Sequence, residues 1–94
     1  MKKKEFEDWH KAGHSGLKQN PFEQYCFYIG TVEAALKKDI DSFPLDKEGR
    51  CLDHIYLGQH FEGKSEKDLV NYRSAVKKYW DFRRWAAKNS PLTK

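Results

Sequence analysis

The sequence predicts an all-α protein, a compact bundle of four helices in the order short, long, short, long. Apolar residues recur at helical spacing in four segments, and Gly, Pro or Asn residues separate these segments. No stretch shows the alternating pattern of a half-buried strand. Ninety-four residues suit one domain with a small core, which three Trp, five Tyr and six Phe can fill. We expect a single helical domain over residues 1–94, with flexible ends at 1–3 and 89–94.

Two helices are predicted in the first half of the chain. Residues 4–12 form the short one, which stops at Gly13. Its apolar side consists of Phe6, Trp9 and His10. The long one is expected over residues 21–38, because Asn20 and Glu23, three residues apart around a proline, are typical of a helix start. Its apolar stripe consists of Phe22, Tyr25, Cys26, Ile29, Val32, Leu36 and Ile40.

A turn and a second short helix follow. Residues 39–45 are predicted to form a turn whose Phe43 and Leu45 enter the core. The helix is expected over residues 48–58 and ends at a glycine. The residues predicted to face inward are Leu52, Ile55 and Tyr56. Phe61 is expected to anchor the loop after this helix.

The segment from Ser65 to Pro91 predicts one long helix with two chemically different sides. The packed side consists of Leu69, Tyr72, Ala75, Val76, Tyr79, Phe82 and Ala86. Four basic residues lie within about 60° of one another on the other side. This basic strip consists of Arg73, Lys77, Arg84 and Lys88. Lys78 flanks the strip, and Trp80 lies at its edge.

Charge is distributed unevenly along the chain. The net charge of +4 is the sum of +2 over residues 1–19, −4 over residues 20–63 and +6 over residues 64–94. A cationic helix face beside an acidic middle favours one oriented contact with a polyanion. Nucleic acid is the commonest extended polyanion in a cell, so the pattern indicates a nucleic-acid-binding surface. The alternative is that the basic strip is an ordinary solvated helix face.

Several of these features occur in an order that resembles a known family. The residues that carry the resemblance are Phe6, Trp9, Ser15, Tyr25, Ile29, the turn 39–43, the run Asn71 to Val76, Tyr79 and Phe82. Together they resemble the N-terminal core-binding, SAM-like domain of tyrosine recombinases and phage integrases, a helical unit that also heads some restriction and defence nucleases. In those proteins the unit clamps duplex DNA through backbone contacts, while a separate domain cuts the DNA. The recombinase catalytic residues are not identifiable here, so the resemblance implies DNA binding only.

We therefore expect a non-catalytic module from a phage, integrase-like or restriction and defence protein, with double-stranded DNA as its partner. The residues expected to contact DNA are Arg73, Lys77, Trp80, Arg84, Lys88 and Lys78. Trp80 would stack on a base or lie against a sugar, and its alternative is a buried indole that seals the core. Arg83 also flanks the basic strip, and the alternative to a contact with DNA is an ion pair with Asp39 or Asp41. Trp85 needs a contact with the first helix or with a partner.

No cofactor, metal or catalytic group is expected. His10 and His14, with Cys51 and His54 and the nearby His60, do not match a common zinc-binding spacing. Cys26 lies on an apolar stripe, and no glycine-rich phosphate loop is present. Two cysteines without framework spacing indicate a reduced, cytoplasmic protein. No apolar run approaches the length needed to span a membrane.

A protein of another class fits the same sequence. It is a protein-interaction domain, or a phage-type inhibitor, that uses its acidic middle and exposed aromatic residues. The aromatic residues considered for this role are Tyr28, Trp80 and Trp85. The DNA site, the protein partner, the oligomeric state and a following catalytic domain are left open by the sequence.

Overall fold

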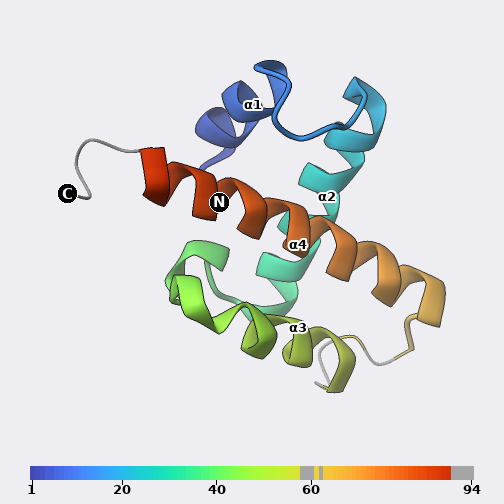
Figure 1. The fold of residues 1–94 in the computed structure, drawn as a ribbon. Helices are drawn as coiled ribbons and strands as arrows, with labels where there is room; N and C mark the ends of the chain where they lie inside the picture. The colour runs from blue at the N-terminus through green and yellow to red at the C-terminus, as the bar shows by residue number, and fades with distance from the viewer. Residues whose placement is uncertain (58–60, 62, 90–94) are drawn as a thin grey trace.

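Two long helices that cross one another organise the fold (Figure 1). The computed structural model describes residues 1–57, 61 and 63–89. Within these residues the four α-helices are α1 (Lys3–Lys11), α2 (Gln19–Leu36), α3 (Glu48–Leu57) and α4 (Glu66–Asn89). Two 3-10 turns, η1 (Ile40–Ser42) and η2 (Leu45–Lys47), connect α2 to α3. The described residues contain no strand, so the predicted all-α class and the order of short and long helices are confirmed.

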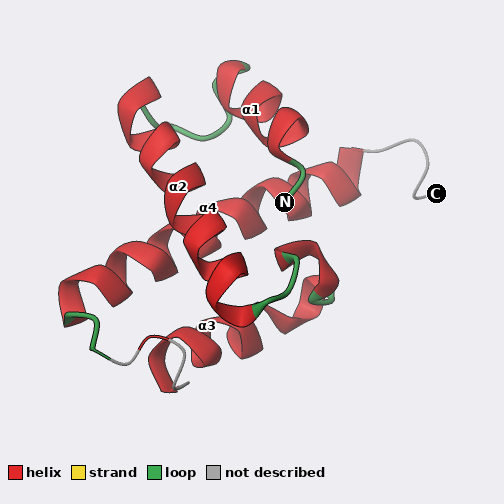
Figure 2. Cartoon of the chain, turned by 180° about the vertical axis from the view of Figure 1, so that it is seen from behind, coloured by secondary structure: helices red, strands yellow, loops and turns green. Residues whose placement is uncertain are grey.

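The short helices lie on opposite sides of α4 (Figure 2). α1 lies beside the C-terminal half of α4, and α3 packs along its other side. The start of the chain also reaches α4, because the backbone N–H of Lys2 donates to the Tyr79 hydroxyl at 2.9 Å. The C-terminal half of α4 is therefore enclosed by the first residues of the chain as well as by α1.

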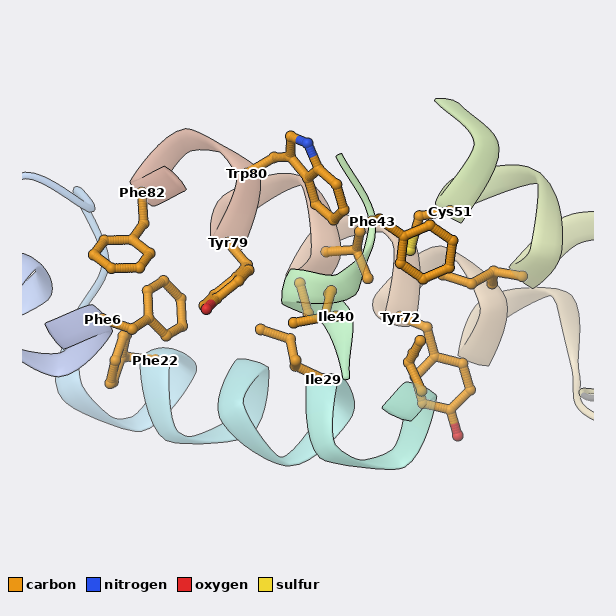
Figure 3. Close-up of a cluster of buried hydrophobic side chains, with 14 of the residues drawn as sticks. Phe6, Phe22, Ile29, Ile40, Phe43, Cys51, Tyr72, Tyr79, Trp80 and Phe82 are labelled. Carbon is orange, nitrogen blue, oxygen red and sulfur yellow. The ribbon is translucent and has the colours of Figure 1, made fainter. Parts of the chain in front are cut away.

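The core lies between α2 and α4 and is mostly aromatic (Figure 3). At the α1 end, the Phe6 ring lies 4.9 Å from Phe22 and 5.0 Å from Tyr79, measured between ring centroids. At the α3 end, the buried residues are Ile29, Ile40, Phe43, Cys51 and Trp80. Tyr72 and Phe61 continue the core toward the start of α4, with ring centroids 5.4 Å apart. The predicted role of Phe61 as a loop anchor is confirmed, because its side chain is buried.

Local signals fix two of the helix ends. The Ser65 hydroxyl accepts the N–H of Asp68 at 3.2 Å, which caps α4 as the sequence predicts. Gly13 has a φ of +90°, a conformation that side chains other than glycine rarely adopt. Its N–H donates to the carbonyl of His10 at 2.9 Å, so the chain turns sharply after α1.

The predicted start of α2 is wrong by two residues. The helix begins at Gln19, and Asn20 lies inside it and does not cap it. Lys18 occupies the cap position without a side-chain hydrogen bond, while the Gln19 side chain donates to Glu23 at 3.0 Å. The proline that follows Asn20 lies in the first turn of the helix, where its missing N–H costs no intrahelical bond.

Two predicted core residues are exposed. Tyr56 on α3 is 44% exposed. Cys51, which was not among the residues predicted to face inward, is buried on the same helix. Leu45 is 37% exposed, and it contributes its backbone carbonyl to the core instead of its side chain. Gly58 and Pro91, which were predicted to end α3 and α4, lie outside the described residues. The flexibility expected of residues 1–3 and 89–94 stays a prediction.

Candidate nucleic-acid interface

The basic strip of α4 lies along the edge of α4 that α3 covers. Two α3 residues, Glu48 and Tyr56, contact Arg84 and Arg73 respectively. Because α3 runs beside the strip, the four cations do not share one environment. Their accessibility has to be considered residue by residue.

Arg73 is held against an aromatic ring. Its guanidinium carbon lies 4.0 Å from the centroid of the Tyr56 ring, a cation–π contact. The Nε of Arg73 is buried and has no hydrogen-bond partner, and no ion pair joins this guanidinium to another described residue. The side chain is therefore oriented by packing and keeps its charge uncompensated, which is the state that a phosphate-binding arginine needs.

Lys77 and Lys88 are exposed along the same strip. Neither side chain forms a hydrogen bond or an ion pair with the part of the chain that the structure describes. Lys77 lies one turn beyond Arg73, about 6 Å along the helix axis. Arg73 and Lys77 therefore form an adjacent pair of uncompensated cations, and Lys88 lies about 16 Å further along α4.

Arg84 differs, because carboxylates surround it. Its guanidinium donates to Asp81 at 3.2 Å and to Glu48 of α3. The side chain is half exposed, yet two acidic groups already compensate its charge. The basic strip is therefore interrupted at Arg84, between Lys77 and Lys88.

Lys78 points away from the strip toward the loop between α1 and α2. Its ammonium donates to the carbonyl of Ser15 at 3.0 Å, and the side chain is half buried. The same loop is held by the buried His10, whose Nδ1 lies 2.6 Å from the Ser15 hydroxyl. Lys78 was predicted to contact a phosphate, and in the structure its ammonium instead contacts the backbone of the loop between α1 and α2.

Trp80 is fully buried, so the prediction that it contacts a base or a sugar is wrong. Its indole N–H donates to the carbonyl of Leu45 at 2.9 Å. The guanidinium carbon of Arg83 lies 4.7 Å from the centroid of the Trp80 ring. The Nε of Arg83 lies 3.6 Å from a carboxylate oxygen of Asp41. The structure therefore has the alternative arrangement for both residues. Trp80 is a buried indole, and Arg83 pairs with Asp41.

Of the three aromatic residues that the sequence singled out, Trp85 is exposed, Tyr28 is half buried and Trp80 is buried. Phe27 on α2 is 70% exposed, and Tyr28 beside it is half buried, with its ring 5.6 Å from that of Tyr72. Trp85 is 38% exposed, and its ring lies 5.0 Å from the His14 ring in the loop that follows α1. Phe27 lies on the side of α2 opposite the apolar stripe, so helical spacing was the signal that could have identified it as an exposed aromatic residue.

Two buried ionisable groups in the core have a raised pKa. Burial raises the pKa of the Cys51 thiol to about 11, which keeps it protonated and a poor nucleophile at neutral pH. Burial, and then the neighbouring Asp41, raise the pKa of Tyr79. Among the described residues, no three His, Cys, Asp or Glu side chains are grouped as a metal would require. In the same part of the chain, no helix has the length and apolar character of a membrane span.

Comparison of the chain with protein-family models, with curated proteins and with solved structures found no match.

Proposed function

We propose that this chain is a non-catalytic module that binds the backbone of duplex DNA through the basic strip of α4. The observation that carries the proposal is the pair formed by Arg73 and Lys77, two neighbouring cations without a compensating acid among the described residues. The core-binding domains that the sequence resembles, in phage, integrase-like or restriction and defence proteins, grip DNA in this way. The resemblance and the charge support the same proposal.

The contact is expected to be a phosphate contact without base recognition. Arg73 is oriented over Tyr56 and can offer its guanidinium to one phosphate, while Lys77 neutralises the next. Lys88 adds a third contact further along the helix. Arg84 adds little, because Asp81 and Glu48 compensate its charge before any ligand arrives. With two or three phosphates neutralised, binding is weak and depends strongly on salt.

Fluorescence anisotropy with a random-sequence duplex tests the proposal. Affinity should fall as salt rises, with a slope that corresponds to about two or three released counterions. Lys77→Glu should weaken binding to every sequence alike and lower the slope by about 1. Because Lys77 is exposed and has no contact to lose, this variant should fold normally.

Lys4→Glu is the matched control. Lys4 is an exposed lysine on α1, and the substitution changes the net charge by the same amount away from the basic strip. Equal losses for the two variants would indicate general charge attraction and would remove the site from α4. Binding that does not change with salt, or no binding at low salt, would remove the proposed function altogether.

A protein-interaction module is the second candidate, and the exposure of Phe27 favours it. Phe27 lies in an open depression on α2 that Asn20, Glu23, Gln24 and Tyr28 also line. A 70% exposed phenylalanine on a regular helix is a typical interface anchor. Phe27→Ser should leave DNA binding unchanged, and a change in elution volume on size-exclusion chromatography would show self-association through this face.

A further inference from the structure

A groove between α1 and the C-terminal end of α4 has a different chemistry from the basic strip. Its volume is about 350 Å³, which suits a single side chain with its adjoining backbone. We name it the α1–α4 groove. The lining residues used here are Lys2, Glu5, Asp8, Trp9, Phe82 and Trp85. None of the residues predicted to bind DNA lines it.

The wall and floor of the α1–α4 groove are aromatic. Phe82 and Trp9 are almost completely buried, so they present only edges to the groove. Trp85 is 38% exposed and supplies the accessible ring. An exposed indole beside apolar side chains is the usual surface for a flat, cationic group.

The rim of the groove carries uncompensated negative charge. Glu5 and Asp8 are exposed and one turn apart on α1, and neither side chain forms an ion pair with a described residue. Lys2 also lines the groove. Together with Glu5 and Asp8 it gives the groove a formal charge of −1, although the whole chain carries +4. The site is therefore complementary to one positive charge.

Trp9 lines the groove with a ring that is almost completely buried. Its indole N–H is buried and has no acceptor among the described residues. Because the ring adjoins the groove, its N–H signal can report on an occupant without a hydrogen bond to it.

We propose that the α1–α4 groove binds an arginine side chain presented by a partner protein. The guanidinium stacks on Trp85 and pairs with the carboxylates of Glu5 and Asp8. Arginine suits this set better than lysine, because its planar group both stacks on a ring and binds carboxylates bidentately. This function is separate from DNA binding and does not depend on it.

The test is an NMR titration of the isotope-labelled chain with a capped Gly-Arg-Gly peptide. The indole N–H signals of Trp9 and Trp85 should shift and saturate. Glu5→Gln and Asp8→Asn should each weaken binding about tenfold, the effect of one lost charge-assisted hydrogen bond. Glu7→Gln is the matched control, because Glu7 lies on the same helix, pairs with Lys11 at 3.5 Å and does not line the groove.

A peptide in which citrulline replaces arginine keeps the shape and loses the charge, so it should bind at least about tenfold more weakly. Equal binding of the two peptides, or unchanged binding by Glu5→Gln and Asp8→Asn, would overturn the proposal. Indole shifts that appear with duplex DNA and not with the arginine peptide would assign the groove to nucleic acid instead. The Lys77→Glu variant should bind the peptide like the original chain, which separates a failure of this proposal from a failure of DNA binding.

Discussion

Two parts of α4 carry similar side chains in opposite states, the paired groups at residues 79–84 and the unpaired cations Arg73 and Lys77. In the C-terminal half, Tyr79 donates to Asp41, Trp80 donates to the Leu45 carbonyl, and Arg84 donates to Glu48. In the N-terminal half, Arg73 contacts only a ring, and Lys77 has no polar partner among the described residues. The segment between α2 and α3, together with the first residue of α3, brings these acids and this carbonyl to the C-terminal half and not to the N-terminal half. What a cation on this helix can do is therefore decided by the neighbouring chain, not by its position on the helix wheel.

Trp80→Ala gives the largest expected effect and tests whether the buried, hydrogen-bonded residues of the C-terminal half contribute most to stability. The indole is fully buried and hydrogen-bonded to η2, so its loss should lower the free energy of unfolding by about 3–5 kcal/mol. Urea denaturation measures this change. Trp85→Ala, at a 38% exposed indole five residues on, should lower it by less than about 1.5 kcal/mol. Similar losses for both variants would contradict the difference in burial.

High pH should destabilise the protein through Cys51, which packs at the same end of the core. The unfolded thiol ionises near its ordinary pKa of 9.0, whereas burial raises the pKa of the folded thiol to about 11. Between these values only the unfolded state releases the proton. The contribution to stability is therefore complete below pH 9 and is lost as pH rises toward 11, by at most about 3 kcal/mol. Denaturation of Cys51→Ala over the same pH range should show a smaller decline, and an identical decline would contradict the assignment.

Tyr79→Phe tests the hydrogen bonds that tie the start of the chain to α4. The hydroxyl donates to Asp41 at 2.7 Å and accepts the N–H of Lys2 at 2.9 Å. Removing it should lower the free energy of unfolding by about 1–2 kcal/mol, because both partners are left without their bond in a partly buried place. Tyr28→Phe removes a hydroxyl that bonds Gln24 at the surface, and it should cost less than about 0.5 kcal/mol. Thermal melts of the two variants make the comparison directly.

The fold was largely predictable because its signals are local. Apolar spacing located all four helices, Ser65 marked the start of α4, and Gly13 marked the end of α1. The wrong cap at Asn20 arose because the residue that begins the helix is decided by contacts outside the motif. Gln19 lies near both His10 and Glu23, and it extends the helix past the asparagine.

The candidate site was predictable only in part, because sequence periodicity gives direction and not accessibility. The helix wheel placed Arg73, Lys77 and Arg84 on one side, and it could not show that α3 would bring Glu48 to one of them. It placed Trp80 at the edge of the strip, where the segment before α3 covers it completely. The α1–α4 groove arises from tertiary packing and has no short sequence signal, whereas the helix period already places Phe27 opposite the apolar stripe of α2.

Glu48→Gln gives the smallest expected effect, and it makes a paired cation of the C-terminal half more like the unpaired cations of the N-terminal half. Without its charge, Glu48 no longer compensates Arg84, and only Asp81 remains beside that guanidinium. The C-terminal half should then gain part of a phosphate contact, so duplex affinity should rise and the salt slope should increase by up to about 1. The stability cost should stay below about 1 kcal/mol, because Arg84 is half exposed. Asp53→Asn removes an exposed acid from the same helix without releasing a cation, and an equal gain in affinity there would show that net charge, not the freed Arg84, governs binding.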